Sequence, residues 1–223
     1  MNPHRHDFIR SCLSSSPLTS PPHNNNNNNL SYLDVGCGGG IFAESAARLP
    51  TTLSVTGIDA SPVILTVARQ HAKRDPSLGQ KLTYVNSPIE SLTLAPVDIV
   101  TCFEVIEHVD YPSRFLGELV KFVKPGGWVV MSTIARTWTS WVTTNLVAED
   151  ILGVVPKGTH DWYKYLHEYE LREWFGKENQ REGRKIWGEA RVMGVVFVPG
   201  CGWREVRGSE KVGNYFFGVQ RLV

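Results

Sequence analysis

The sequence lacks the features that would place the chain in a membrane span or in a disulfide framework. No run approaches the roughly 18 consecutive apolar residues that cross a bilayer, and the first residues lack the basic-then-apolar pattern of a secretory signal. The four cysteines, Cys12, Cys37, Cys102 and Cys201, form no CxxC pair, which argues against a disulfide framework and indicates a reducing compartment. A net charge of +1 gives no general attraction to nucleic acid or to an acidic membrane.

The length and the composition of the chain are typical of one globular domain. At 223 residues, with 42% hydrophobic and 20% charged side chains, the chain is long enough to bury one core and short for two. The tract over residues 14–29 is rich in Ser, Pro and Asn and is too polar to order itself, so we expect a flexible loop there. This loop would separate an amphipathic helix over residues 1–13 from a single domain over residues 30–223.

Strand and helix patterns alternate through this domain, which predicts an α/β fold with helices on both faces of a parallel sheet. Seven strands are expected, over residues 30–35, 53–59, 82–86, 97–103, 128–134, 191–198 and 213–222. Helices are expected from Ser61, from Pro112 and over residues 166–174, and the first of them has a buried stripe that includes Ile64, Leu65, Val67, Ala68 and Ala72. The prediction is a doubly wound, mostly parallel, Rossmann-like sheet of seven strands, closed by an antiparallel hairpin at its edge.

A glycine-rich turn follows the first predicted strand and opens a helix. Residues 36–40 contain four glycines, which permit positive φ angles or the close approach of a ligand. Asp59 ends the next strand, where a carboxylate can accept hydrogen bonds from a ribose diol. A dinucleotide fingerprint would place a third glycine at position 41, where this chain has Ile41. The close-packed glycines and the acidic Asp34 on the strand therefore favour S-adenosylmethionine over NAD.

Longer motifs carry a specific resemblance. LDVGCGGG, GID and VKPGG, at residues 33–40, 57–59 and 123–127, are similar to the successive motifs of class I S-adenosylmethionine-dependent methyltransferases. Within that superfamily the chain most closely resembles the O-methyltransferases of ubiquinone biosynthesis, which methylate polyprenylated catechols, and fungal mitochondrial members in particular. The closer match is carried by the segments MNPHR (1–5), CFEVIEHV (102–109), VPKGTH (155–160) and VGNY (212–215).

The resemblance implies a cofactor site built from distant parts of the chain. Gly36 and Asp59 would hold the methionine and ribose portions, Phe103 would line the pocket, and Arg5 would reach it from the first helix. The complete expected cofactor set is Arg5, Asp34, Gly36, Gly38, Asp59 and Phe103.

A second implied site lies in the segment EVIEH at residues 104–108. The resemblance implies that Glu104, Glu107 and His108 bind a divalent metal, with Mg²⁺ expected, and that His108 and Glu107 are catalytic. The i, i+3, i+4 spacing could bring the three side chains onto one ion if a helical turn begins there, and that ion would lower the pKa of a catechol hydroxyl. Two alternatives stay open: the glutamates cap the following helix beside a structural His108, or His108 is a general base without metal.

Other segments have weaker signals. Trp138 and Trp141 lie in an apolar stretch that is either core or, because a polyprenyl substrate resides in a bilayer, an interfacial membrane contact. Lys157 and His160 either contact the substrate or fix a loop. The resemblance further implies a peripheral position on the matrix side of the mitochondrial inner membrane, with other ubiquinone-biosynthesis proteins as partners and no nucleic acid.

Two departures from the family limit the expected activity. The family segment similar to residues 1–5 is internal and follows a tryptophan-containing segment, so we expect this chain to lack that segment and a mitochondrial targeting peptide. The asparagine tract also loosens the tether on Arg5. The competing interpretation is a catalytically weak S-adenosylmethionine-binding scaffold subunit of a quinone-biosynthesis complex. An NAD-dependent oxidoreductase is disfavoured by Ile41.

Overall fold

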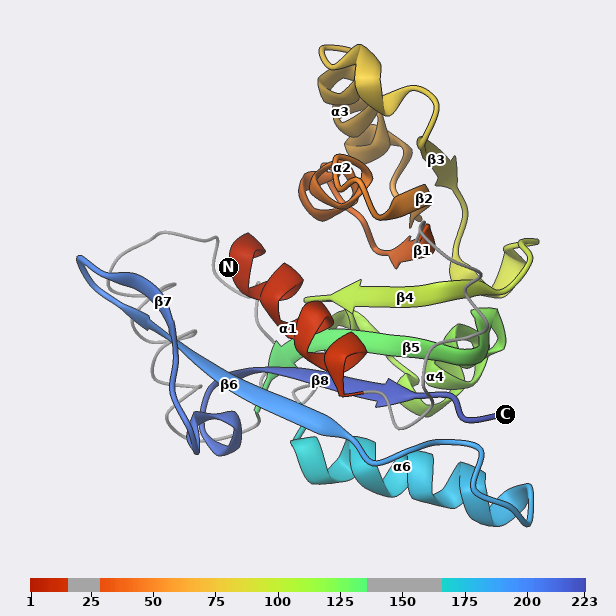
Figure 1. Cartoon of the computed structure of the whole chain (residues 1–223), viewed down its shortest axis with the longest axis vertical. Helices are drawn as coiled ribbons and strands as arrows, with labels where there is room; N and C mark the ends of the chain where they lie inside the picture. Colours follow the sequence, from red (N-terminus) through yellow and green to blue (C-terminus); the bar gives the residue numbers. More distant parts are fainter. Residues whose placement is uncertain (16–28, 136–165) are drawn as a thin grey trace.

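An eight-stranded sheet with the order β3-β2-β1-β4-β5-β8-β6-β7 forms the centre of the fold. The structure is a computed structural model that describes residues 1–15, 29–135 and 166–223. Five strands run parallel: β1 (Leu30–Val35), β2 (Thr52–Asp59), β3 (Leu82–Asn86), β4 (Val97–Phe103) and β5 (Val123–Ile134). Three strands extend the sheet by antiparallel pairing: β8 (Asn214–Gln220), β6 (Arg191–Val198) and β7 (Gly202–Glu205) (Figure 1).

The predicted α/β sheet and its antiparallel edge are confirmed, with one strand more than expected. β1, β3, β4 and β6 have the predicted bounds, whereas β5 begins at Val123, which already pairs with Val97, rather than at residue 128. The additional strand is β7, which pairs with the end of β6. Its sequence, GWRE, is too short and too polar to show a strand pattern, so its pairing with β6 determines it.

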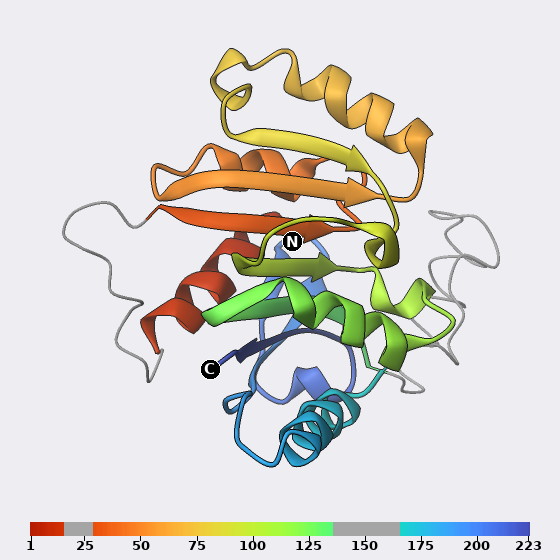
Figure 2. The same cartoon turned by 90° about the vertical axis from the view of Figure 1, so that its right-hand side faces the viewer.

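Helices cover both faces of the sheet (Figures 1 and 2). α1 (Asn2–Ser14) and α2 (Ile41–Ala47) pack on one face, with α3 (Pro62–Ala72) beside α2. α4 (Pro112–Leu119) and α6 (Glu168–Arg181) pack on the other. Short 3-10 turns lie at η1 (Pro76–Leu78), η2 (Ile89–Ser91), η3 (Ile106–His108), η4 (Val120–Phe122) and η7 (Ser209–Lys211).

α3 begins as predicted but buries less than predicted. The Ser61 hydroxyl accepts a hydrogen bond from the Ile64 N–H at 3.4 Å, as an N-cap residue does. Leu65 and Ala68 are buried, but Ile64 and Val67 are 43% and 55% exposed, so the predicted stripe is wrong at these two positions. The reason is the place of α3, which contacts the sheet mainly at β2 and β3, next to its edge.

Several expectations fall outside the described residues. They are most of the proposed loop at 14–29, the apolar segment with Trp138 and Trp141, and the residues Lys157 and His160. Within the described ranges, no helix combines the length and apolar character that a bilayer crossing requires.

α1 is seated on the sheet at a glycine of β8. Phe8, Ile9 and Cys12 of α1 are buried, and they belong to the same core cluster as Phe216 of β8. A Cβ atom at Gly218 would lie 2.7 Å from the Cys12 sulfur and 3.2 Å from a Phe8 ring carbon. Close seating of α1, which carries Arg5, therefore requires the absence of a side chain at this position.

The variant Gly218→Ala is expected to lower the free energy of unfolding by about 1–3 kcal/mol, because the added methyl group overpacks the contact with α1. Gly117→Ala in α4 is the matched control, since no described atom lies within 4 Å of a Cβ there. It should be neutral or stabilise by up to about 1 kcal/mol. Urea denaturation of both variants measures the difference, and equal unfolding free energies would contradict the seating of α1 on Gly218.

Candidate active site

A cavity of about 400 Å³ opens at the edge of the sheet where β1, β2, β3 and β4 end. Four of the predicted site residues line it: Gly36, Asp59, Glu104 and His108. The turn after β3, residues 87–90, also lines it, and sequence reasoning missed this turn. The sequence could have indicated this turn. It follows the carboxyl end of β3, and the carboxyl ends of neighbouring parallel strands lie at the same edge of a sheet.

The glycine-rich turn provides both internal packing and open space. Gly36, Gly38 and Gly40 all have positive φ. A Cβ at Gly36 would lie 2.4 Å from a methyl group of Val105, and one at Gly40 would lie 2.0 Å from the Tyr84 hydroxyl oxygen. At Gly38 no described atom lies within 4 Å of the Cβ position. Gly36 and Gly40 thus let the protein pack on itself, whereas Gly38 and Gly39 both leave open space, and Gly38 lies next to Asp59.

Asp59 connects this turn to the start of α3. One carboxylate oxygen accepts the Gly38 N–H at 3.0 Å, and the other accepts the Ser61 N–H at 2.8 Å. Each oxygen of a carboxylate has a second lone pair. Asp59 is therefore fixed in orientation and can still accept two hydrogen bonds from a ligand diol.

Arg5, Asp34 and Phe103 lie together on the α1 side of the sheet. Asp34 is buried and accepts a hydrogen bond from the Thr101 hydroxyl at 2.7 Å, and burial raises its pKa to about 7. The Arg5 guanidinium lies 4.7 Å from the centroid of the Phe103 ring. Burial lowers the pKa of Arg5, and its Nε is buried without a hydrogen-bond partner among the described residues. A buried acid and an unsatisfied donor suit a ligand that carries both an amine and a carboxylate.

The two glutamates of the EVIEH segment are held on opposite faces of the sheet. Glu104 has a positive φ of 57°, its N–H donates to the Ser132 carbonyl at 3.0 Å, and its carboxylate accepts the Ser132 hydroxyl. The Glu107 carboxylate accepts the Thr133 hydroxyl at 2.9 Å. Successive side chains of a strand point to opposite faces. Ser132 and Thr133 of β5 therefore hold the two carboxylates by hydroxyl groups on different faces, although the charge of Glu104 still acts on Glu107.

The structure does not bring the predicted metal ligands together. The predicted helical turn is present as η3, but among the described residues no three His, Cys, Asp or Glu side chains are placed to hold an ion. His108 is exposed and lines the cavity, whereas Glu107 is only 4% exposed and does not. In this arrangement Glu104, Glu107 and His108 do not fit a metal ion, and their metal role stays a prediction.

The capping alternative is wrong for α4, the α-helix that follows. α4 has Tyr111 at its N-cap, and no side chain caps it by a hydrogen bond. Glu104 and Glu107 are held by β5 instead. Of the open interpretations of this segment, a metal-independent base at His108 agrees best with the observed positions.

The buried carboxyls predict that stability falls as pH rises. Burial and the neighbouring charge of Glu104 raise the pKa of Glu107 to about 8, and burial raises that of Asp34 to about 7. Between the ordinary carboxyl pKa and these raised values, the folded state binds more protons than the unfolded state. The stability is therefore complete below the ordinary carboxyl pKa, and it is lost as pH rises through about 7 and 8. Glu107→Gln should flatten the decline of the melting temperature between about pH 5 and pH 9.

Circular dichroism melts across this range measure the slope. Glu173→Gln, at a 59% exposed side chain on α6, is the matched control and should keep the slope of the parent chain. If Glu107→Gln leaves the slope unchanged as well, the carboxyl at this position does not enter the folded state protonated.

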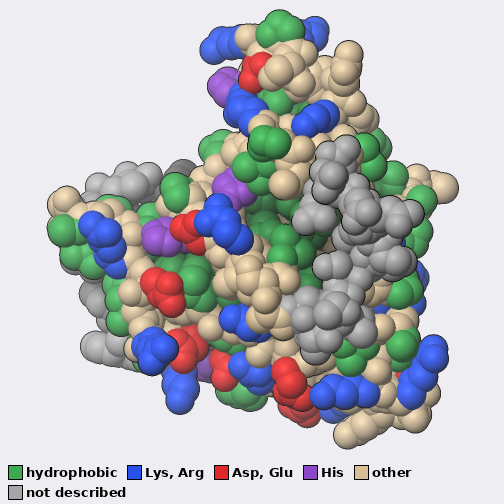
Figure 3. All heavy atoms as spheres, viewed as in Figure 1, with side chains coloured by type: hydrophobic (Ala, Val, Ile, Leu, Met, Phe, Trp, Pro, Cys, Tyr) green, Lys and Arg blue, Asp and Glu red, His purple; other side chains and the backbone are tan. Residues whose placement is uncertain are grey.

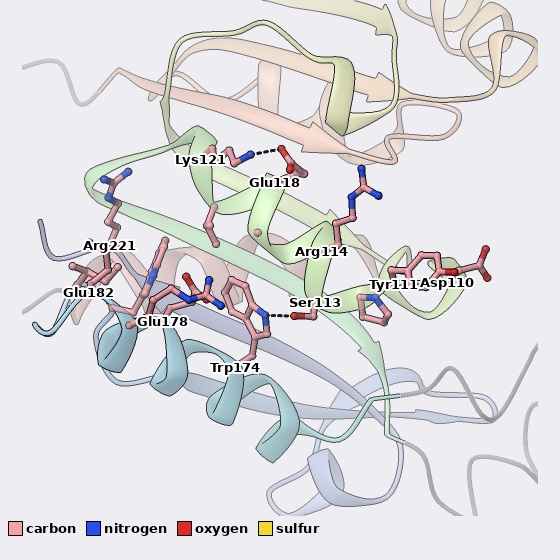
Figure 4. Close-up of a pocket in the computed structure, with 16 residues that line it drawn as sticks. Asp110, Tyr111, Ser113, Arg114, Glu118, Lys121, Trp174, Glu178, Glu182 and Arg221 are labelled. Atoms are coloured by element: carbon pink, nitrogen blue, oxygen red, sulfur yellow. Dashed lines mark hydrogen bonds and ion pairs between the residues drawn. The ribbon is translucent and has the colours of Figure 1, made fainter.

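A larger cavity of about 950 Å³ lies between α4 and α6 and contains none of the predicted site residues (Figure 4). Its polar groups include neighbours that pair with one another. Lys121 contacts Glu118 at 2.6 Å, and the Trp174 indole N–H donates to the Ser113 hydroxyl at 2.9 Å. Asp59, the glycine turn and Arg5 lie instead at or near the edge where the parallel strands end. We therefore place the candidate site at that edge.

Comparisons with known proteins show the fold and the family of the chain. Residues 33–131 match the family described as "Methyltransferase domain". The magnesium protoporphyrin IX methyltransferase of Synechocystis, solved with bound SAH, superposes with a TM-score of 0.64 at 18% identity and covers 99% of this chain and 83% of that one. At this identity the likeness shows the fold alone, a class I methyltransferase fold.

Two fungal proteins are more similar to this chain in sequence. The mitochondrial ubiquinone biosynthesis O-methyltransferase of Candida albicans is 44% identical over 87% of this chain, which spans only 59% of that protein's length. The protein of the same name from Schizosaccharomyces pombe is 37% identical over 99% of this chain and 77% of its own length. The chain therefore belongs to the ubiquinone biosynthesis O-methyltransferase family.

Proposed function

We propose that the chain transfers a methyl group from S-adenosylmethionine to a catechol hydroxyl of a polyprenylated ubiquinone precursor. The observation that carries this proposal is the cavity at the carboxyl edge, which Asp59 lines and where the Asp59 carboxylate is fixed by the N–H of Gly38, a glycine with open space beside it. Family membership supports the substrate class, since the relatives are named for O-methylation in ubiquinone biosynthesis.

The residues present fit this cofactor at its ribose, its amine and its carboxylate. Asp59 accepts the ribose hydroxyls, the buried Asp34 pairs with the amine, and the unsatisfied Arg5 Nε donates to the carboxylate. When bound, S-adenosylmethionine supplies an electrophilic methyl group on a sulfonium centre. Because Gly38 has no side chain and open space beside it, the ligand can lie close to the backbone there.

His108 receives the proton of the substrate hydroxyl. It is exposed and lines the cavity, so it reaches a hydroxyl in the cavity and passes the proton on to water. An imidazole is suited to this role because its unperturbed pKa lies near neutral pH. Loss of the proton makes the oxygen nucleophilic, and the new bond to carbon forms as the bond from that carbon to sulfur breaks.

Metal assistance is the variant of this proposal that requires a rearrangement. A divalent ion such as Mg²⁺ would be held by Glu104, Glu107 and His108 only if the carboxylates left the Ser132 and Thr133 hydroxyls. The proton transfer proposed for His108 therefore uses no metal. Methyl transfer that survives chelation would exclude the variant, and transfer that stops with EDTA and returns with Mg²⁺ would support it.

The proposal extends to location and partners. The fungal relatives are named mitochondrial, and we place this chain on the matrix side of the inner membrane, as a peripheral protein working with other ubiquinone-biosynthesis proteins. Fractionation of the source cells, followed by alkaline carbonate extraction of the mitochondria, tests this placement. The protein should be released from the membrane pellet, whereas recovery outside mitochondria would contradict the placement.

The decisive test of function is transfer of a labelled methyl group to a short-chain catechol, with and without EDTA. Product bearing the label on oxygen supports the proposal. Calorimetry on the same preparation measures cofactor binding separately. Cofactor binding with no transfer would contradict the enzyme and favour the scaffold interpretation.

A further inference from the structure

The first turns of α1 are joined to α2 by two hydrogen bonds that meet at one hydroxyl group. The Asn2 amide donates to the Ser45 Oγ atom at 2.9 Å, and the His6 Nε2 atom lies 2.8 Å from the same oxygen. The Ser45 hydroxyl itself donates to the Phe42 carbonyl at 2.9 Å. A hydroxyl has one proton and two lone pairs, so His6 donates from Nε2 and every hydrogen bond that this hydroxyl can make is made. We call Asn2, His6 and Ser45 the α1–α2 clamp.

The α1–α2 clamp lies at the rim of the core. All three of its side chains are half-buried, and Ser45 belongs to the helix that begins directly after the glycine-rich turn. Figure 1 shows the N-terminal end of α1 on the side toward α2, and Figure 3 shows His, Lys or Arg, and Asp or Glu side chains gathered at the surface there. Removing one of these polar contacts therefore leaves the packing of the core intact.

Aromatic contacts connect the α1–α2 clamp to Arg5. The His6 ring stacks on Phe42 with ring centroids 5.1 Å apart, and Phe42 meets Phe103 edge to face at 4.8 Å. The Arg5 guanidinium lies over the same Phe103 ring. Phe42 and Phe103 are both buried, and closely packed side chains have little room to shift. The clamp and the Arg5 guanidinium therefore rest on one pair of adjacent rings.

The Arg5 guanidinium has a task that depends on its direction. Its Nε atom is buried without a hydrogen-bond partner among the described residues, and the charges of Glu104 and Asp34 act on it. A guanidinium presents its N–H groups in a rigid planar fork, so its hydrogen bonds to a carboxylate depend on how the whole group is turned. Hydrogen bonds weaken steeply when donor and acceptor are misaligned. A small tilt of α1 would therefore weaken binding of a carboxylate before it affected the fold.

We propose that Asn2, His6 and Ser45 are positioning residues for S-adenosylmethionine: the α1–α2 clamp fixes the direction of Arg5 and thereby sets the affinity for the carboxylate of the cofactor. None of the three side chains lines the cavity, so they act through Arg5. The inference rests on the proposed function for the contact between Arg5 and this carboxylate. It requires that loss of the clamp affect one end of the cofactor and leave the ribose end unchanged.

Calorimetric titration with two forms of the cofactor tests the clamp. Decarboxylated S-adenosylmethionine lacks the carboxylate and keeps the amine, the ribose and the base. The test variant is Ser45→Ala. The matched control is Ser11→Ala, because the Ser11 hydroxyl of α1 also donates to the carbonyl three residues before it, at 2.8 Å, and no hydrogen bond joins it to α2 among the described residues. Ser45→Ala should bind S-adenosylmethionine about tenfold more weakly, as a hydrogen bond to a charged group is lost. It should bind the decarboxylated form as the parent chain does, and Ser11→Ala should bind both forms as the parent does.

Two further variants keep the test decisive if Ser45→Ala folds poorly. His6→Phe keeps an aromatic ring on Phe42 and removes the hydrogen bond to Ser45, and it should show the same selective loss. In a chain that already carries Arg5→Gln, adding His6→Phe should cause no further loss of affinity for S-adenosylmethionine. Equal weakening of both cofactor forms would make the clamp a merely structural contact, and unchanged affinity in both clamp variants would show that it is not needed. Either result overturns the proposal.

Methyl transfer to a short-chain catechol separates this inference from the proposed function. Ser45→Ala should raise the KM for S-adenosylmethionine about tenfold and keep the kcat of the parent, since saturating cofactor restores the occupied site. A lower kcat with an unchanged KM would contradict the proposal. If the parent chain methylates no catechol but the clamp variants still lose affinity only for the form with the carboxylate, the proposed function fails while the positioning role stands. If the parent binds both forms equally, Arg5 does not contact the carboxylate and the positioning role is wrong.

Discussion

Replacing Asp59 by asparagine is expected to weaken the binding of S-adenosylmethionine by about 100-fold, because two hydrogen bonds to a charged acceptor are worth about 3 kcal/mol together. The carboxylate accepts two backbone N–H groups, from Gly38 and Ser61. An amide has one oxygen, so its NH₂ group would face one of these donors. The variant thus loses ligand hydrogen bonds and disturbs the turn that positions the ligand.

Calorimetric titration of S-adenosylmethionine into Asp59→Asn and into the parent chain measures this loss. Asp75→Asn is the matched control, because Asp75 also accepts the N–H two residues ahead, from Ser77 at 3.1 Å, but lies at η1. The control should bind the cofactor as the parent does. An Asp59→Asn variant with the affinity of the parent would show that this carboxylate has no part in cofactor binding.

The sequence carries enough information to find the glycine turn and its ligand class, but not the function of each glycine. Positive φ and close approach are both reasons for glycine, and local sequence does not separate them. The space beside Gly36 is filled by Val105 and that beside Gly40 by Tyr84, residues far along the chain. Only the assembled sheet shows that the open positions are Gly38 and Gly39.

In the EVIEH segment, too, local sequence does not determine what each residue contacts, and here the question of a metal site depends on it. The i, i+3, i+4 spacing predicts a helical turn, and η3 is present. It cannot predict which way the glutamates turn, because that is decided by Ser132 and Thr133 on the neighbouring strand. β4 was predictable to the residue because a buried parallel strand is largely apolar, whereas the four-residue β7 depends on its pairing with β6.

The second large effect is expected at His108. Replacing it by asparagine should lower kcat for a short-chain catechol by about 100- to 1000-fold, which lies within the range of general acid–base catalysis. The affinity for S-adenosylmethionine should stay that of the parent, because the residues assigned to the cofactor's polar groups are Arg5, Asp34 and Asp59. Glu107→Gln should cost less in kcat, since Glu107 is buried against Thr133 and lies outside the cavity lining.

Steady-state kinetics with separate kcat and KM values distinguish these roles, with His71→Asn as the control. His71 contacts Glu44 at 2.8 Å in the α2–α3 contact and should tolerate the change. The pH profile adds a readout that a structural histidine would not move: the parent should lose activity at acidic pH as the imidazole is protonated, and His108→Asn should lose that limb. Free imidazole should restore part of the rate to the variant. If Glu107→Gln instead removes more activity than His108→Asn, then the buried carboxylate leaves Thr133 during the reaction, and the assignment of the base to His108 is wrong.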